Sequence, residues 1–153
     1  MDTEDVRFWT RTGIDDTGIT RAAVKNLLGG HEGASTITMQ LVQNLRQTVA
    51  SYDNDDEAYQ RAQASTLAGK LQEIKYSLEY EKKHSKKEIL ESYLNTVYFG
   101  NTYYGLGAAA QGYFSVDAKD LTIPQAALIA GLVQSPEAYN PVNHPEAAKA
   151  RRD

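Results

Sequence analysis

Apolar residues in this sequence recur every three or four positions, and glycine, proline and helix-capping side chains separate one such run from the next. The clearest run is formed by Leu67, Leu71, Ile74 and Leu78, which share one face of a helix. No stretch alternates convincingly between apolar and polar residues, as a half-buried strand does. The spacing therefore predicts an all-α fold.

Capping side chains predict where the helices begin. Ser85 with Glu88, and Thr122 with Gln125, have the spacing of a capping box, in which two side chains and two backbone amides bond reciprocally. The other helices are predicted over residues 17–28, from an N-cap at Ser35, from Leu67 to the charged residues 81–87, and from Asn143 to the end.

The helical pattern is interrupted at residues 51–64 (SYDNDDEAYQRAQA), which are acidic and polar with scattered tyrosines and alanines. A segment with so few apolar side chains buries little surface to offset the entropy of ordering it. We therefore expect a mobile excursion between two helices.

Composition limits the class of protein. The 153 residues fit one domain with a sizeable core, and a net charge of −4 argues against a general nucleic-acid binder. The absence of cysteine excludes a disulfide framework and a thiolate metal site. No apolar run approaches the roughly 18 residues that cross a bilayer, so we expect this segment to be soluble by itself. Met1 directly precedes charged residues, which suggests a piece cut from a longer chain.

Two polar clusters are candidates for chemistry. Ser35 and Thr36 stand at a predicted helix start, where a hydroxyl either caps the helix or helps its positive end to hold a phosphate. The stretch alone favours capping. Lys70 and Glu73 are three residues apart on one helix face, which usually means a solvated ion pair. Glu73 also precedes the apolar Ile74, so it flanks the predicted buried face.

Other ionisable residues have a plain interpretation when taken singly. Glu4 and Asp5 are adjacent carboxylates, which in a first helical turn usually complement the helix dipole at the surface. His31, His84 and His144 fall in loops or at helix ends, and none has a second histidine four residues away. We predict no metal site built from histidines.

Five blocks follow one another along the chain: EDVRFWTRTGID (residues 4–15), GASTITMQLVQN (33–44), KLQE (70–73), ILESYLNTVYFGNTYYGLGAAAQGYF (89–114) and LTIPQAALIAGLVQSPEAYNP (121–141). Together they resemble the signature blocks of the peptidoglycan glycosyltransferase domain, glycosyltransferase family 51, of bacterial class A penicillin-binding proteins. The resemblance covers almost the whole chain.

This resemblance implies a lysozyme-like helical fold of two lobes with a cleft. Residues 1–153 would form one glycosyltransferase domain, truncated at both ends, with residues 46–66 as a mobile jaw that approaches the membrane. In the family a transmembrane anchor precedes this domain and a transpeptidase domain usually follows it. The implied location is the extracytoplasmic face of the bacterial cell membrane.

The implied reaction is the polymerisation of lipid II. The 4-hydroxyl of an acceptor sugar attacks the anomeric carbon of a lipid-linked glycan and expels undecaprenyl pyrophosphate with inversion. By resemblance Glu4 is the general base, and Glu73 organises the pyrophosphate. A divalent cation (Mg²⁺ or Mn²⁺) is the expected cofactor, with no organic cofactor.

The resemblance also implies the substrate contacts and the partners. With it, phosphate binding at the start of the second block becomes the preferred interpretation. The partners would be lipid II, the growing lipid-linked glycan, an inhibitor of the moenomycin type and the membrane surface. The implied substrate-binding residues are Asp5, Arg11, Ser35, Thr36, Gln40, Asn44 and Lys70.

Three positions depart from the family pattern. Arg11 replaces the usual His, Gln43 replaces Lys or Arg, and Gly69 replaces the Arg that usually precedes Lys70. Two of these changes remove a cation near the expected anion. Gly69 also lies inside a predicted helix, where glycine costs about 1 kcal/mol relative to alanine. Two alternatives therefore stay open: a catalytically weakened glycan- or lipid-binding module of the same fold, and a lysozyme-like glycan hydrolase.

Overall fold

The structure, a computed structural model, describes Asp5, residues 8–10, residues 35–63 and residues 66–153. In these residues the secondary structure consists of helices, with one isolated bridge between Tyr98 and Tyr104. This confirms the predicted all-α class. The helix predicted over residues 17–28 lies outside the described residues.

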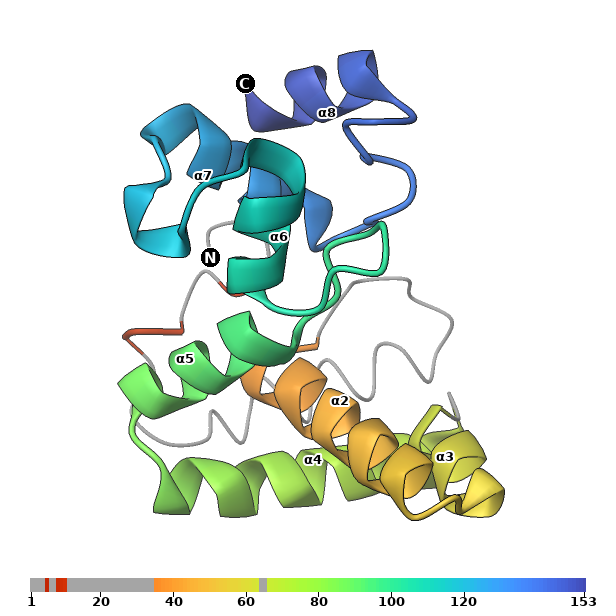
Figure 1. The fold of residues 1–153 in the computed structure, drawn as a ribbon. Coiled ribbons are helices and arrows are strands. Elements are labelled where there is room, and N and C mark those ends of the chain that lie inside the picture. The colour runs from red at the N-terminus through yellow and green to blue at the C-terminus, as the bar shows by residue number, and fades with distance from the viewer. Residues whose placement is uncertain (1–4, 6–7, 11–34, 64–65) are drawn as a thin grey trace. The chain divides into compact units, whose positions relative to one another are not determined.

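The chain divides into two compact units, one formed by residues 4–90 and the other mainly by residues 91–153. The first unit contains α2 (Ile37–Tyr52), α3 (Asp56–Gln63) and α4 (Leu67–Lys83). In Figure 1, α3 lies beside the C-terminal end of α2, and both helices pack against α4. The fully buried side chains of this unit include Phe8, Ile37, Thr38, Leu41 and Ile89.

The second unit begins within α5 (Lys86–Thr96), whose first residues belong to the first unit. It contains α6 (Leu106–Phe114), the short 3-10 helix η1 (Ala118–Asp120), α7 (Ile123–Leu132) and α8 (Pro145–Arg152). Helix α7 packs against both α6 and α8 (Figure 1). Gly112 is required in α6 because a Cβ atom there would collide with the ring of Tyr103. The buried side chains of this unit include Phe99, Ala109, Ala110, Ile129, Leu132 and Asn140.

Both predicted capping boxes are present. The backbone N–H of Ser85 donates to Glu88 Oε2 at 2.7 Å, and that of Thr122 donates to Gln125 Oε1 at 2.9 Å. The predicted start of the last helix at Asn143 is wrong. Helix α8 begins at Pro145, and its N-cap residue makes no side-chain hydrogen bond. Proline has no N–H to satisfy, and its fixed φ angle already suits the first helical position.

The expected apolar face of α4 is only partly buried. Leu71 is 54% exposed, whereas Glu73 and Ser77 are 8% and 3% exposed. Apolar spacing predicted the position of the helix but not the face that packs inward. The buried face of α4 includes two polar side chains, and each has a partner within the same helix. Glu73 is paired with Lys70, and the Ser77 hydroxyl donates to the carbonyl of Ile74 at 2.7 Å.

The acidic residues 51–63 are largely helical, so the predicted break in the helical pattern is wrong, and the expected mobility stays a prediction. Helix α2 continues to Tyr52, and α3 follows after a short turn. The Oδ1 atom of Asp55 accepts a hydrogen bond from the N–H of Ala58 at 2.8 Å, and Asp56 and Glu57 occupy the first turn of α3. Carboxylates at that end stabilise a helix through its dipole, so the acidic run is a helix start.

Candidate active site

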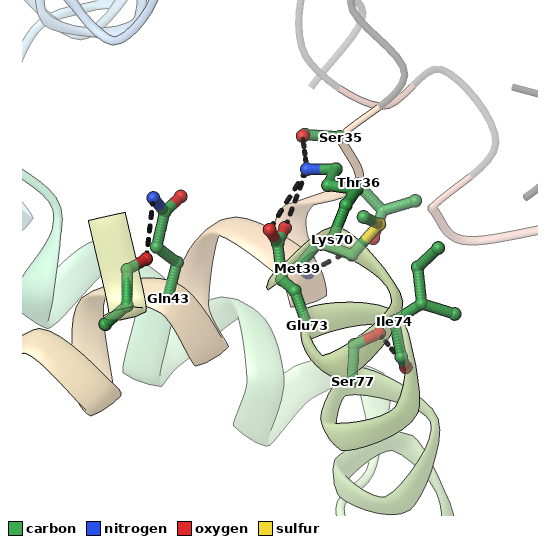
Figure 2. A network of polar contacts seen from close by, with 9 residues as sticks. Ser35, Thr36, Met39, Gln43, Lys70, Glu73, Ile74 and Ser77 are labelled. Carbon is green, nitrogen blue, oxygen red and sulfur yellow. Dashed lines mark hydrogen bonds and ion pairs between the residues drawn. The ribbon is translucent and has the colours of Figure 1, made fainter. Parts of the chain in front are cut away.

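Two adjacent hydroxyl residues at the start of α2 have different partners. Thr36 is the N-cap, and its Oγ1 accepts a hydrogen bond from the N–H of Met39 at 3.2 Å. The prediction that Ser35 caps this helix is therefore wrong by one residue. Ser35 Oγ instead accepts a hydrogen bond from Lys70 Nζ at 2.8 Å (Figure 2). Since Thr36 satisfies the helix end, the hydroxyl of Ser35 is available to the site.

Lys70 joins the second block to the third. Its Nζ atom lies 3.0 Å from Glu73 Oε1 and 3.1 Å from Oε2, in addition to the contact with Ser35. Figure 2 shows the carboxylate of Glu73 and the hydroxyl of Ser35 on two sides of the ammonium group. The Lys70 side chain is 33% exposed and that of Glu73 is 10% exposed. The cluster thus presents one partly accessible cation above a buried carboxylate.

Asp5 ties the first block to the same helix start. Its Oδ2 atom accepts a hydrogen bond from the N–H of Ile37 at 3.3 Å, and its backbone carbonyl accepts one from the N–H of Phe8 at 3.1 Å. A carboxylate at a helix N-terminus is stabilised by the free amides and the dipole. Three predicted site residues, Asp5, Ser35 and Thr36, therefore lie at the start of α2.

The other predicted residues of the second block lie further along α2. Gln40 and Asn44 are half-buried in its first and second turns. Gln43, which stands where the family usually has a cation, donates from Nε2 to the carbonyl of Ala62 in α3 at 3.3 Å. In Figure 2 it lies apart from the Lys70–Glu73 pair. Gln43 therefore fastens α3 to α2.

Arg46, a basic residue of α2, also bonds away from the cluster. The guanidinium of Arg46 donates to Gln72 Oε1 at 3.0 Å and lies 5.2 Å from the ring centroid of Tyr76. Among the described residues, Lys70 is consequently the cation that the structure places against Ser35 and Glu73. Glu4 and Arg11, the predicted base and the residue in the usual His position, lie outside the described residues.

Comparison with known proteins identifies the family of the chain. The family model described as Transglycosylase matches residues 1–153. The chain belongs to the transglycosylase family. This confirms the resemblance to the peptidoglycan glycosyltransferase domain of penicillin-binding proteins, a hexosyltransferase.

Curated relatives agree with the assignment of this transglycosylase domain. It is 44% identical over 152 residues to penicillin-binding protein 1A of Streptococcus oralis, covering 98% of this chain and 22% of the relative. It is also 44% identical to penicillin-binding protein 1A/1B of Bacillus subtilis, covering 99% and 15%. For penicillin-binding protein 1A of Neisseria gonorrhoeae the identity is 40%, covering 97% and 17%. The chain thus spans less than a quarter of the length of these relatives.

The side chains at the cluster do not fit a divalent cation held by protein alone. The described residues of the transglycosylase domain contain no group of three His, Asp or Glu side chains close enough to share a metal ion. Both oxygens of Glu73 already face the ammonium of Lys70, and Asp5 faces a backbone amide. The expected requirement for Mg²⁺ or Mn²⁺ stays a prediction.

The fourth and fifth blocks of the transglycosylase domain meet through two asparagines. Asn140, which is fully buried, donates from Nδ2 to Asn101 Oδ1 at 2.9 Å and accepts from the N–H of Val142 at the same distance. Asn101 itself has a φ of 50°, a left-handed conformation that Asn adopts more readily than most residues. This contact was not predicted from the sequence. The available signal was that Asn101 directly follows a glycine and that Asn140 directly precedes a proline.

Tyrosine hydroxyls of the fourth block are used inside the second unit. Tyr98 donates to Glu137 Oε1 at 2.7 Å, and this bond raises the pKa of Tyr98. Tyr113 donates to the carbonyl of Phe99 at 2.9 Å, and burial raises the pKa of Tyr113 to about 12. Both hydroxyls therefore keep their protons at neutral pH and act as structural donors.

Proposed function

We propose that this domain polymerises lipid II into glycan strands and releases undecaprenyl pyrophosphate. The observation that carries the proposal is the cluster of Ser35, Lys70 and Glu73, because it brings hydrogen-bond donors of two signature blocks to the start of α2. A pyrophosphate leaving group needs positive charge and donors where its own negative charge develops. Lys70 supplies the charge, and the N-terminus of α2 adds its dipole.

The proposed reaction is one displacement at the anomeric carbon. The oxygen of the acceptor 4-hydroxyl forms a bond to this carbon as the bond to the pyrophosphate oxygen breaks, with inversion. The hydroxyl proton passes to the carboxylate of Glu4, and the negative charge leaves on the lipid pyrophosphate. Family resemblance assigns Glu4 this role as base, and the carboxylate of the next residue, Asp5, accepts a hydrogen bond at the start of α2.

Ser35 and Glu73 have supporting parts in this proposal. The Ser35 hydroxyl accepts from Lys70 and keeps its own hydrogen, which is then a donor for a phosphate oxygen. Glu73 holds the ammonium of Lys70 in place, and its burial keeps that contact out of water. A lysine oriented in advance binds an anion with less loss of side-chain entropy.

We further propose that the first unit contacts the membrane that carries the substrate. Two apolar side chains near the end of α2 support this: Val49 is 59% exposed and Tyr52 is 87% exposed. Beside them a cavity of about 440 Å³ lies between α2, α3 and α4. None of the helices in the described part of the chain combines the length and apolar content of a membrane span. In the full-length protein we expect an anchor and a transpeptidase domain, as in the family.

The experiment that tests the proposed function compares the wild-type protein with the Glu4→Gln variant on labelled lipid II. Glutamine preserves the shape but accepts no proton at neutral pH, so turnover should fall by about two or more orders of magnitude while the fold survives. A variant that polymerises at a near-normal rate would remove Glu4 from the role of base.

The same assay separates the two alternatives. The missing cations at Gln43 and Gly69 favour a weakened binding module, which would retain lipid II without lengthening it. A hydrolase would shorten finished glycan and give no polymer. Polymer formed from lipid II by the wild-type protein contradicts both alternatives.

A further inference from the structure

A polar strip runs along one face of α4, and the proposed reaction uses only the part of it formed by Lys70 and Glu73. The members of the strip are spaced three or four residues apart, so they share a face of the helix: Lys70, Glu73, Ser77 and Glu81. Figure 2 shows Lys70, Glu73 and Ser77 following one another along α4. The Glu81 side chain is 10% exposed. The far end of the strip thus offers a buried carboxylate that the site does not use.

The start of α2 is attached to both ends of this strip. Ser35 Oγ accepts a hydrogen bond from Lys70 Nζ at 2.8 Å. Three residues later the hydroxyl of Thr38, which is fully buried, donates to Glu81 Oε1 at 2.5 Å. At 1.5 Å per residue, Lys70 and Glu81 are about 16 Å apart along the axis of α4. The two hydrogen bonds therefore attach α2 to two separate points of α4.

The attachment at Thr38 is the firmer of the two. Its acceptor, Glu81 Oε1, also lies 3.3 Å from the ammonium nitrogen of Lys86, so the buried carboxylate has an opposite charge beside it. A hydrogen bond to a carboxylate is about twice as strong as one between neutral groups. The other attachment is a lysine on a flexible stem, and its side chain is 33% exposed. Lys70 can adjust to the position of Ser35 but does not set it.

We propose that Thr38 is a positioning residue for the leaving-group site: its bond to Glu81 fixes the first turn of α2 on α4 and so holds the Ser35 hydroxyl against Lys70. This inference rests on the proposed role of Ser35 and Lys70 in binding the pyrophosphate. A displacement of about 1 Å in an active site costs on the order of a hundredfold in rate. Thr38 therefore affects kcat without contacting the substrate.

The test compares variants of the full-length protein. Thr38→Val replaces the hydroxyl by a methyl group of similar size, and Thr38→Ser keeps the hydroxyl. Ser35→Ala removes the positioned group itself, alone and together with Thr38→Val. Thr48→Val is the matched control, because Thr48 is an exposed residue of α2 whose hydroxyl donates to the carbonyl of Asn44 in the same helix.

We expect Thr38→Val to lower kcat by about tenfold, with the KM for detergent-solubilised lipid II within about threefold of wild type, because the misplaced groups face the charge that develops on the leaving pyrophosphate. Thr38→Ser and Thr48→Val should keep most of the wild-type kcat. In the Ser35→Ala background, Thr38→Val should lower kcat by less than about twofold, since the group that it positions is already absent.

A second measurement does not depend on activity. Brief acetylation of the protein with acetic anhydride, followed by mass spectrometry, compares the reactivity of Lys70 with that of Lys75, an exposed residue of the same helix. Thr38→Val should raise the labelling of Lys70 relative to Lys75 by about fivefold, as expected for the loss of one hydrogen bond. Ser35→Ala should give the same increase, and the double variant should add nothing to it.

A third variant covers the case in which Thr38→Val does not fold because Glu81 has lost a partner. The triple variant Thr38→Val, Glu81→Met, Lys86→Met replaces the whole buried group by apolar side chains, which is often neutral or stabilising. Its melting temperature should be close to that of the wild-type protein, whereas its kcat should stay about tenfold lower.

Three results overturn the proposal. The first is unchanged labelling of Lys70 in a folded Thr38→Val variant. The second is a double variant whose kcat falls by the product of the two single losses, about a hundredfold, because independent effects multiply. The third is a triple variant that recovers kcat together with the melting temperature. If the wild-type protein makes no polymer, the proposed function fails, and the labelling of Lys70 still decides whether Thr38 holds Ser35 in place.

Discussion

Thr36 caps helix α2, and this leaves the hydroxyl of Ser35 available to the site. Both are good N-cap residues, and the sequence alone favoured Ser35. Thr36 takes the cap because helix α2 begins one residue later, and Ser35 is then within 2.8 Å of Lys70. A shift of one residue in the start of the helix thus decides which hydroxyl caps it and which hydroxyl faces the site.

Lys70 is the residue on which binding of the leaving group should depend most. Lys70→Gln removes the cation that contacts Ser35 and Glu73, and we expect kcat/KM for lipid II to fall by about a hundredfold or more. Lys75→Gln is the control, since Lys75 lies on the same helix and is exposed. Measured side by side, equal rates for the two variants would contradict the role of Lys70.

Gly69 offers a gain of function. Arginine at this position would stand beside Lys70 and bind phosphate oxygens bidentately. Gly69→Arg should therefore tighten binding of a moenomycin-type phosphoglycolipid severalfold, as measured by calorimetric titration. The expected gain in stability is smaller than the sequence suggested. Gly69 lies in the first turn of α4, where its N–H donates to Thr66 Oγ1 at 3.1 Å and where the dipole disfavours a cation.

The result that would count against this prediction is unchanged affinity together with a lower melting temperature. That combination would mean that the arginine side chain disturbs the packing of α4 and that another basic residue already fills the role.

Of the two helices α3 and α4, α3 should open more easily. Its eight residues include one buried side chain, Ala62, whereas α4 is 17 residues long and buries Glu73 and Ser77. Helices with few buried contacts open locally at low free energy. We expect amides in residues 56–63 to exchange with solvent faster than those in the middle of α4. Equal protection of both helices in plain buffer would contradict the expected mobility of the jaw.

At the scale of the whole molecule, membrane contact should depend on the apolar end of α2. Burying a valine side chain is worth about 1.5 kcal/mol or more, so Val49→Asp should weaken binding to liposomes of bacterial phospholipids by about tenfold. Val142→Asp is the matched control, because Val142 is 69% exposed in the other unit. Sedimentation with liposomes measures both, and equal losses would show that α2 is not the contact.

The sequence by itself determined the all-α class, both capping boxes and the family. Each of these depends on residues close together in the chain, such as Ser85 and Glu88, or on the order of motifs along it. The acidic run at residues 51–64 misled the same local reasoning. Asp55 and its neighbours are poor residues for a helix interior and good ones for a helix start, and composition does not separate the two.

Only the tertiary structure decided which polar groups meet. The contact of Ser35 with Lys70 spans 35 residues, and that of Thr38 with Glu81 spans 43. The burial of Glu73 in place of Leu71 likewise depended on which face of α4 packs inward. Such contacts arise because a buried charge needs a partner that compensates it, near or distant in the chain, and apolar periodicity contains no information about that partner.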